Sequence, residues 1–289
     1  MISVFLSTNT HDISSMGKQE LIAGVKERSS QIVSNLKSWS KLEWILFFAI
    51  VPLLLFLIFL LPQNVKDSYL IFNTAEIFKV HTIILHAYTH STFDHLIGNV
   101  TFYIFVLAVI FLFENDKKRF WILMGCAFLL VPVINAVLTF VFWNFLNKDT
   151  TSQGFSGIAA TLSAYALMAF IFWGLHDVMP MFRNTTKLKG REYIGYAMMC
   201  LLIAIVLCGV IVFGFQLGLF VSGENFVSNG IAHFSGFFTG LLGLFFYDIL
   251  REDRIINFDV IFGISILIGI YMYVPYLQKL INVINPAGV

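Results

Sequence analysis

The sequence predicts an all-α polytopic membrane protein, and three observations support this fold class. Hydrophobic residues make up 58% of the 289 residues and charged residues only 12%, whereas a soluble domain carries roughly 25% charged residues. The mean hydropathy is +0.83. Seven stretches free of Asp, Glu, Lys and Arg are each long enough to cross the membrane as a helix, and none shows the strict alternation of a barrel strand.

The basic residues indicate which side of the membrane each connection faces. Of the 18 Lys and Arg residues, 14 lie in the N-terminal segment or in the connections after the second, fourth and sixth spans. Because Lys and Arg concentrate on the cytoplasmic side, we expect a multi-pass cell-membrane protein with a cytoplasmic N-terminus and an external C-terminus. The expected spans are Trp44–Leu61, Leu96–Phe113, Phe120–Leu146, Gly154–Leu175, Tyr193–Gly223, Asn229–Tyr247 and Val260–Gln278.

The spans divide the chain into three parts. Residues 1–43 form a polar cytoplasmic segment, either an amphipathic helix on the inner leaflet or a disordered tail. Residues 44–249 form a six-helix core. Residues 250–289 hold a cytoplasmic connection, the seventh transmembrane helix and a short outer tail. The first outer connection, about 62–93, is long enough to be a functional loop.

Composition also excludes several classes of protein. A net charge of +1 leaves no basic excess for nucleic acid, so no nucleic-acid partner is expected. The high hydrophobicity excludes an intrinsically disordered chain. The three cysteines lie in apolar runs and form neither a disulfide framework nor a CxxC metal site.

Three groups of polar or small residues occur at the outer starts of the second, fourth and sixth expected spans. Strongly polar side chains inside a membrane are costly, and by default they mark function. The predicted topology places all three groups at the same depth, just below the outer surface. The groups are His86, His90, His95 and Asn99; then Gly154, Phe155, Ser156 and Gly157; then Ala232, His233, Ser235, Gly236 and Gly240.

The fourth and sixth spans each carry small residues at four-residue spacing, which lets two helices pack closely in lipid. If these two stripes face each other, Ser156 and His233 meet at the top of the contact. A serine needs a base within hydrogen-bond reach to become nucleophilic, and His233 would supply it. The stripes are Ser156, Ala160 and Ala164 in one span, and Ala232, Gly236 and Gly240 in the other.

The second span offers hydrogen-bond donors for the same chemistry. His95 and Asn99 are four residues apart and project from one helical face. Acyl transfer develops an oxyanion that needs such donors, and the Ser156 N–H at a helix N-terminus adds a third. Gly154 and Gly157 leave room for a substrate backbone.

Each group also has other interpretations. A single histidine in a span is more often a hydrogen-bonded structural residue than a base. The set of His86, His90 and His95 contains frequent metal ligands, although its spacing lacks the glutamate of an HExxH zinc protease. A transporter would use the polar groups as an ion path, but it predicts charged residues deep in the spans, and the seven stretches contain none.

Taken together, the motifs resemble those of the rhomboid family of intramembrane serine proteases. They follow the family's order on the second, fourth and sixth spans, over about residues 44–249. The resemblance implies a rhomboid-like six-helix catalytic core, with the seventh span appended after it. The matching motifs are His90-x4-His95-x3-Asn99, Gly154-Phe155-Ser156-Gly157 and Ala232-His233-x2-Gly236-x3-Gly240.

The same resemblance implies roles for these residues and requires no cofactor or metal. Ser156 would be the nucleophile, His233 the general base and acid, and His95 and Asn99 the oxyanion donors. The fifth span with the loop at 218–229 would form a gate for substrates. Supporting roles fall to His86, His90, Gly154, Gly157, Gly236 and Gly240. Two departures from the family pattern are Phe78-Lys79 in place of a Trp-Arg pair and Ala160 in place of a tyrosine.

These expectations predict a serine endopeptidase that acts within the bilayer. Its partners would be single-span membrane proteins, each cleaved in its transmembrane segment near the outer leaflet. Helix backbone hydrogen bonds bury the scissile carbonyl groups, so the substrate helix must unwind first. The alternative is a catalytically inert relative that binds membrane proteins as a chaperone or adaptor.

Overall fold

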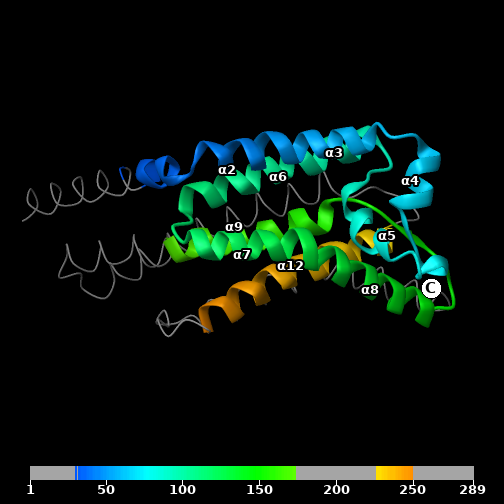
Figure 1. The fold of residues 1–289 in the computed structure, drawn as a ribbon. Coiled ribbons are helices and arrows are strands. Elements are labelled where there is room, and N and C mark those ends of the chain that lie inside the picture. The colour runs from blue at the N-terminus through cyan, green and yellow to red at the C-terminus, as the bar shows by residue number, and fades with distance from the viewer. Residues whose placement is uncertain (1–29, 31, 174–225, 250–289) are drawn as a thin grey trace, which may run out of the picture.

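The computed structural model describes residues 30, 32–173 and 226–249, and these residues are mostly helical (Figure 1). Three helices in this part of the chain are long and apolar enough to cross a membrane: Lys41–Phe59, Phe93–Phe113 and Lys117–Phe145. The expectation of an all-α membrane protein is thereby confirmed. The spans expected at Tyr193–Gly223 and Val260–Gln278 lie outside the described residues, so the seven-span count and the orientation stay predictions.

The three long helices each begin three residues before the sequence-predicted span. The prediction excluded charged residues, whereas Lys41, Asp94 and Lys117 occupy the first turns of these helices. In each case a side chain caps the exposed N–H groups, as helix N-termini require. Ser40 and Glu43 form a capping box, Thr92 accepts from His95 N–H, and Asp116 accepts from Lys118 and Arg119 N–H.

The first and third long helices each contain one π-helical turn. The first comprises α2 (Lys41–Ile45), η1 (Leu46–Ile50) and α3 (Val51–Phe59). The second is α6 (Phe93–Phe113). The third comprises α7 (Lys117–Gly125), η4 (Cys126–Leu130) and α8 (Val131–Phe145). Figure 1 shows these helices in one bundle, with α12 (Phe226–Ile249) alongside α7 and α8.

The first outer connection is an ordered structure at one end of the bundle, here called the loop end. It contains α4 (Gln63–Tyr69), β1 (Phe72–Asn73), η2 (Thr74–Glu76), α5 (Val80–Leu85) and η3 (His86–Tyr88). Strand β1 pairs antiparallel with β2 (Thr151–Ser152), with Phe72 opposite Ser152. This pairing fixes the connection to the chain just ahead of α9 (Ser156–Trp173).

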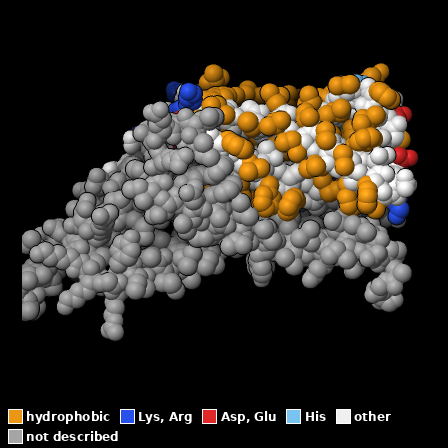
Figure 2. All heavy atoms as spheres, turned by 90° about the horizontal axis from the view of Figure 1, so that it is seen from below, with side chains coloured by type: hydrophobic (Ala, Val, Ile, Leu, Met, Phe, Trp, Pro, Cys, Tyr) orange, Lys and Arg blue, Asp and Glu red, His pale blue; other side chains and the backbone are white. Residues whose placement is uncertain are grey.

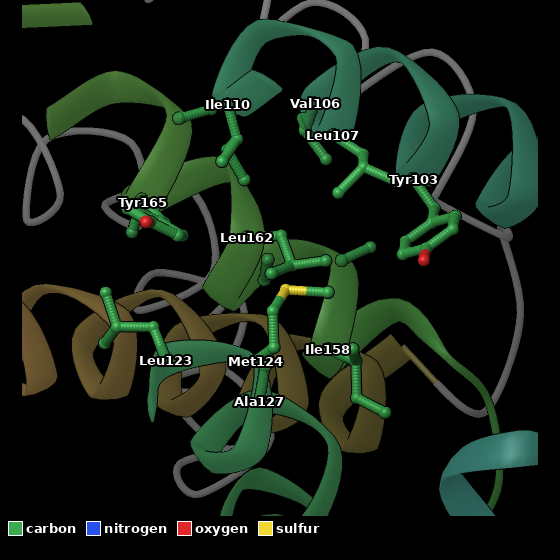
Figure 3. Close-up of a cluster of buried hydrophobic side chains, with 14 of the residues drawn as sticks. Tyr103, Val106, Leu107, Ile110, Leu123, Met124, Ala127, Ile158, Leu162 and Tyr165 are labelled. Carbon is green, nitrogen blue, oxygen red and sulfur yellow. The ribbon is translucent and has the colours of Figure 1, made fainter. Parts of the chain in front are cut away.

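Helix α9 is the centre of the bundle. Every side chain from Phe155 to Ala169 is buried, and α9 makes its most extensive contacts with α12 and then with α6. Figure 3 shows how α6, α7 and α9 meet in an apolar core. Its labelled members are Tyr103, Val106, Leu107 and Ile110 from α6, Leu123, Met124 and Ala127 from α7 and η4, and Ile158, Leu162 and Tyr165 from α9.

Helices α9 and α12 approach each other through glycines. A Cβ added to Gly236 would overlap the Gly157 carbonyl, and one added to Gly240 would lie 2.5 Å from Thr161 O. The Thr161 hydroxyl lies 3.0 Å from Gly157 O and 2.9 Å from Gly236 O and bridges the helices. The predicted α12 stripe therefore does face α9.

The sequence predicted the wrong set of residues for the α9 face that contacts α12, displaced by one residue at two of the three positions. The closest approaches are made by Gly157, Thr161 and Ala164, not by Ser156, Ala160 and Ala164. With 3.6 residues per turn, Gly157 and Thr161 share a face, whereas Ser156 lies about 100° away from it. Gly157, the neighbour of Ser156, therefore makes the close contact with α12.

The surface between the two ends is apolar. Figure 2 shows hydrophobic side chains along the visible described surface, with charged side chains confined to its ends. Leu53 and Leu57 on α3 and Val141 on α8 are half exposed or more. A continuous apolar patch of this extent is costly in water and suits a lipid-facing surface.

At the opposite end, the turn between α6 and α7 carries a buried ion pair. Arg119 donates from Nε and from a terminal guanidinium nitrogen to the two oxygens of Glu114, at 2.8 Å each. The Tyr165 hydroxyl donates to the same carboxylate at 2.7 Å. The Glu114 side chain is fully buried, and these bonds satisfy a charge that would otherwise be costly.

The N-terminal segment is attached to this end of the bundle. Its described residues 32–38 are helical. Trp39 stacks on Phe111 at 3.9 Å between ring centroids and donates from Nε1 to Phe111 O at 2.9 Å. The Lys117 ammonium lies 3.0 Å from the centre of the Trp39 ring. The bundle core therefore begins at Trp39, before the predicted boundary at residue 44.

We predict that Gly240→Ala destabilises the protein, because the new methyl group meets the Thr161 carbonyl and forces α9 and α12 apart. The expected loss is about 1–3 kcal/mol, seen as a lower thermal unfolding midpoint in detergent. Gly125→Ala is the matched control, since nothing lies within 4 Å of its Cβ position. An equal drop in both variants would contradict a special role for the close contact.

Candidate active site

The turn before α9 holds Ser156 at the loop end. Gly154 has a φ of +127°, which favours glycine, and its N–H donates to His86 O at 2.9 Å. The Phe155 ring is buried against Tyr103, with 5.4 Å between ring centroids. Ser156 is the first residue of α9, so its N–H has no intrahelical acceptor.

His95 and Ser156 flank the same glycine. A Cβ placed on Gly154 would lie 3.2 Å from His95 Cε1 and 3.9 Å from Ser156 Oγ. Both side chains are buried. The His95 ring also meets His90 edge-on, with 5.2 Å between ring centroids. Because Gly154 has no side chain, His95 and Ser156 can both lie close to it. The structure therefore brings together these three of the predicted site residues.

Asn99 follows His95 by one turn of α6 and is fully buried. Neither its Nδ2 nor its Oδ1 has a hydrogen-bond partner among the described residues, and the same holds for both ring nitrogens of His95. A buried polar group without a partner costs about 1–3 kcal/mol. Two such side chains on one face provide hydrogen-bonding capacity for a bound molecule.

His233 is fully buried on α12, beside the first turn of α9. The preceding carbonyl, Ala232 O, lies 3.2 Å from the Cβ position of Gly157, and Gly236 meets the Gly157 backbone directly. His233 also lies within electrostatic range of His95. His233 therefore lies on the turn of α12 that packs against Gly157, the residue after Ser156.

His86 and His90 support the turn. His86 Nδ1 lies 3.1 Å from Thr82 O, and its carbonyl accepts the Gly154 N–H. The Phe155 N–H points at His90 Nε2 at 3.5 Å. Burial lowers the pKa of His86 to about 4, so the ring is neutral at physiological pH. Within the described residues, no group of three His, Cys, Asp or Glu side chains is arranged to hold a metal ion.

The structure describes the last four residues of the loop that was predicted to form part of the substrate gate. Residues 226–229, expected in the loop at 218–229, are helical and form the start of α12. The loop expectation is wrong for these four residues, because the apolar pattern of α12 extends back to Phe226. The rest of that loop and the fifth span lie outside the described residues.

Asn135 was not among the residues that the sequence predicted for the site. This residue on α8 is 2% exposed, and its Oδ1 accepts a hydrogen bond from the Ser235 hydroxyl. A Cβ on Gly157 would overlap its amide nitrogen. The signal was present, since an amide in the middle of an apolar span is as conspicuous as Asn99.

The chain was compared with protein-family models, with curated proteins and with solved structures, and none of them matches it.

We predict that Ser156 is the residue labelled by a serine-directed fluorophosphonate probe, because its hydroxyl borders Gly154 together with the His95 ring, at a helix N-terminus. Ser156→Ala should abolish labelling, read as probe fluorescence on a denaturing gel. Ser163→Ala is the matched control, because this buried serine on the same helix donates to Ala160 O one turn away from the candidate site. Equal labelling of wild type and Ser156→Ala would contradict the assignment.

We also predict a pH-dependent contribution of His86 to stability. Its pKa is about 4 in the folded chain against an ordinary value of 6.5, so the unfolded state binds more protons between these values. Stability is therefore lost as pH falls from about 6.5 to about 4. Thermal midpoints of wild type and His86→Gln should converge over this window. A constant difference from pH 7 to pH 4 would contradict the prediction.

Proposed function

We propose that this protein is a serine endopeptidase of the rhomboid type, acting inside the membrane on transmembrane segments of other membrane proteins. The observation that carries the proposal is the arrangement around Gly154, whose open side is bordered by both Ser156 Oγ and the His95 ring. The partnerless amide of Asn99 lies one turn further along α6. A nucleophile next to buried donors without partners is the arrangement that acyl transfer needs.

In the proposed reaction, Ser156 Oγ attacks the scissile carbonyl carbon while His233 accepts the hydroxyl proton. The carbonyl oxygen becomes an oxyanion that accepts hydrogen bonds from His95, Asn99 and the Ser156 N–H. When the carbon–nitrogen bond breaks, His233 returns the proton to the leaving amine. Water then hydrolyses the acyl-enzyme by the same steps, with His233 again as the base.

The burial of the site supports a substrate that arrives within the bilayer. Ser156 and His233 are almost fully enclosed, while the helices around them present apolar side chains outward. An extended peptide needs its backbone close to the nucleophile, and the bare Cα of Gly154 leaves that space. We therefore propose that the substrate is a single-span segment unwound near the outer leaflet.

The test is cleavage of a tagged single-span protein in liposomes. Wild type should cut, whereas Ser156→Ala and His233→Ala should be folded and inactive. Asn99→Ala removes one oxyanion donor and should lower kcat about 10²–10³-fold. Trp39→Phe is the control, because it removes one buried hydrogen bond at the opposite end of the bundle. If folded wild type cuts no substrate and takes no probe, the binding or chaperone function replaces this proposal.

A further inference from the structure

Asn135 lies between the two helices that carry Ser156 and His233. Its amide meets Gly157, the residue after Ser156, so closely that a Cβ there would lie 3.3 Å from Asn135 Cγ and would overlap Nδ2. Its Oδ1 accepts from the hydroxyl of Ser235, two residues after His233. One side chain from a third helix, α8, therefore contacts α9 and α12 at the level of the candidate site.

The hydrogen bonds of Ser235 involve residues on both sides of His233 in α12. The Ser235 hydroxyl donates to Asn135 Oδ1 and also lies 3.2 Å from Ala232 O. Ala232 and Ser235 flank His233 on either side, and the Ala232 carbonyl lies 3.2 Å from the Cβ position of Gly157. Asn135 thus restrains the turn of α12 from which the His233 side chain projects.

Helix packing alone does not account for this amide. The contact between α9 and α12 is already closed by Gly236 and Gly240, and the Thr161 hydroxyl bridges it a turn below. An apolar side chain at residue 135 would fill the same space without the cost of a polar group in a membrane helix. Unlike an apolar side chain, the Asn135 amide forms a directional hydrogen bond with Ser235.

We propose that Asn135 is a positioning residue that, through Ser235 and Gly157, sets the distance between His233 and Ser156. This proposal rests on the proposed function. A catalytic base displaced by about 1 Å costs on the order of 100-fold in rate. Loss of the bond should therefore slow chemistry far more than it weakens substrate binding.

The test measures kcat and KM for the single-span substrate, together with the rate of fluorophosphonate labelling, on full-length variants in liposomes. Asn135→Leu keeps the branching at Cγ but puts two methyl groups in place of the amide oxygen and nitrogen, and Ser235→Ala removes only the hydroxyl. Each should lower kcat and the labelling rate about 10- to 100-fold with KM within about twofold. Ser235→Thr retains the hydroxyl and should restore most of the rate.

Two comparisons separate positioning from loss of stability. Trp39→Phe also removes one buried hydrogen bond from the bundle, the one to Phe111 O at the opposite end, so it should lower the thermal midpoint and leave kcat per folded molecule unchanged. The double variant Asn135→Leu with Ser235→Ala should be no slower than Asn135→Leu alone, because both act through one contact.

The outcomes distinguish the two proposals. If wild type cuts and takes the probe while Asn135→Leu and Ser235→Ala match it in kcat, only the Asn135 proposal is overturned. If the two effects multiply in the double variant, or if Ser235→Thr is as slow as Ser235→Ala, the shared contact is likewise overturned. If wild type neither cuts nor takes the probe, both proposals fail.

Discussion

The close approach of α9 and α12 is the constraint on which the rest of this structure depends. Lipid supplies no hydrophobic force between helices, so their association relies on backbone proximity and hydrogen bonds. Here three glycines remove the side chains that would separate the two backbones, and Thr161 bridges them. Because Ser156 and His233 stand at the same end of this contact, the register of the two helices sets the geometry of the candidate site.

Helix α9 is fixed at both of its ends, which makes that register stiff. At the loop end, Gly154 bonds to the His86 carbonyl and the strand pair β1–β2 holds the preceding chain. At the opposite end, Tyr165 donates to the buried carboxylate of Glu114. A central helix with polar restraints at each end cannot slide along its neighbours without breaking buried hydrogen bonds, and each such break is costly in lipid.

The sequence predicted which helices exist and which residues gather, but not their fine positions. Charge-free runs located the membrane helices, yet they began three residues late because Lys41, Asp94 and Lys117 lie within capped first turns. Small-residue spacing identified the face of α12 but missed that of α9 by one residue, since several small residues surround Ser156. Asn135 was overlooked because no partner for it can be inferred along its own helix.

The buried polar side chains of the bundle differ in whether they have hydrogen-bond partners, and this difference supports a functional site. Thr161, Ser235 and Glu114 are buried and hydrogen-bonded within the bundle. His95 and Asn99 are equally buried, yet the described part of the protein offers their side-chain nitrogen and oxygen atoms no partner. Stability alone would replace such groups with apolar ones. Their presence on the helix face that borders Gly154 fits donors arranged in advance for charge that develops only during a reaction.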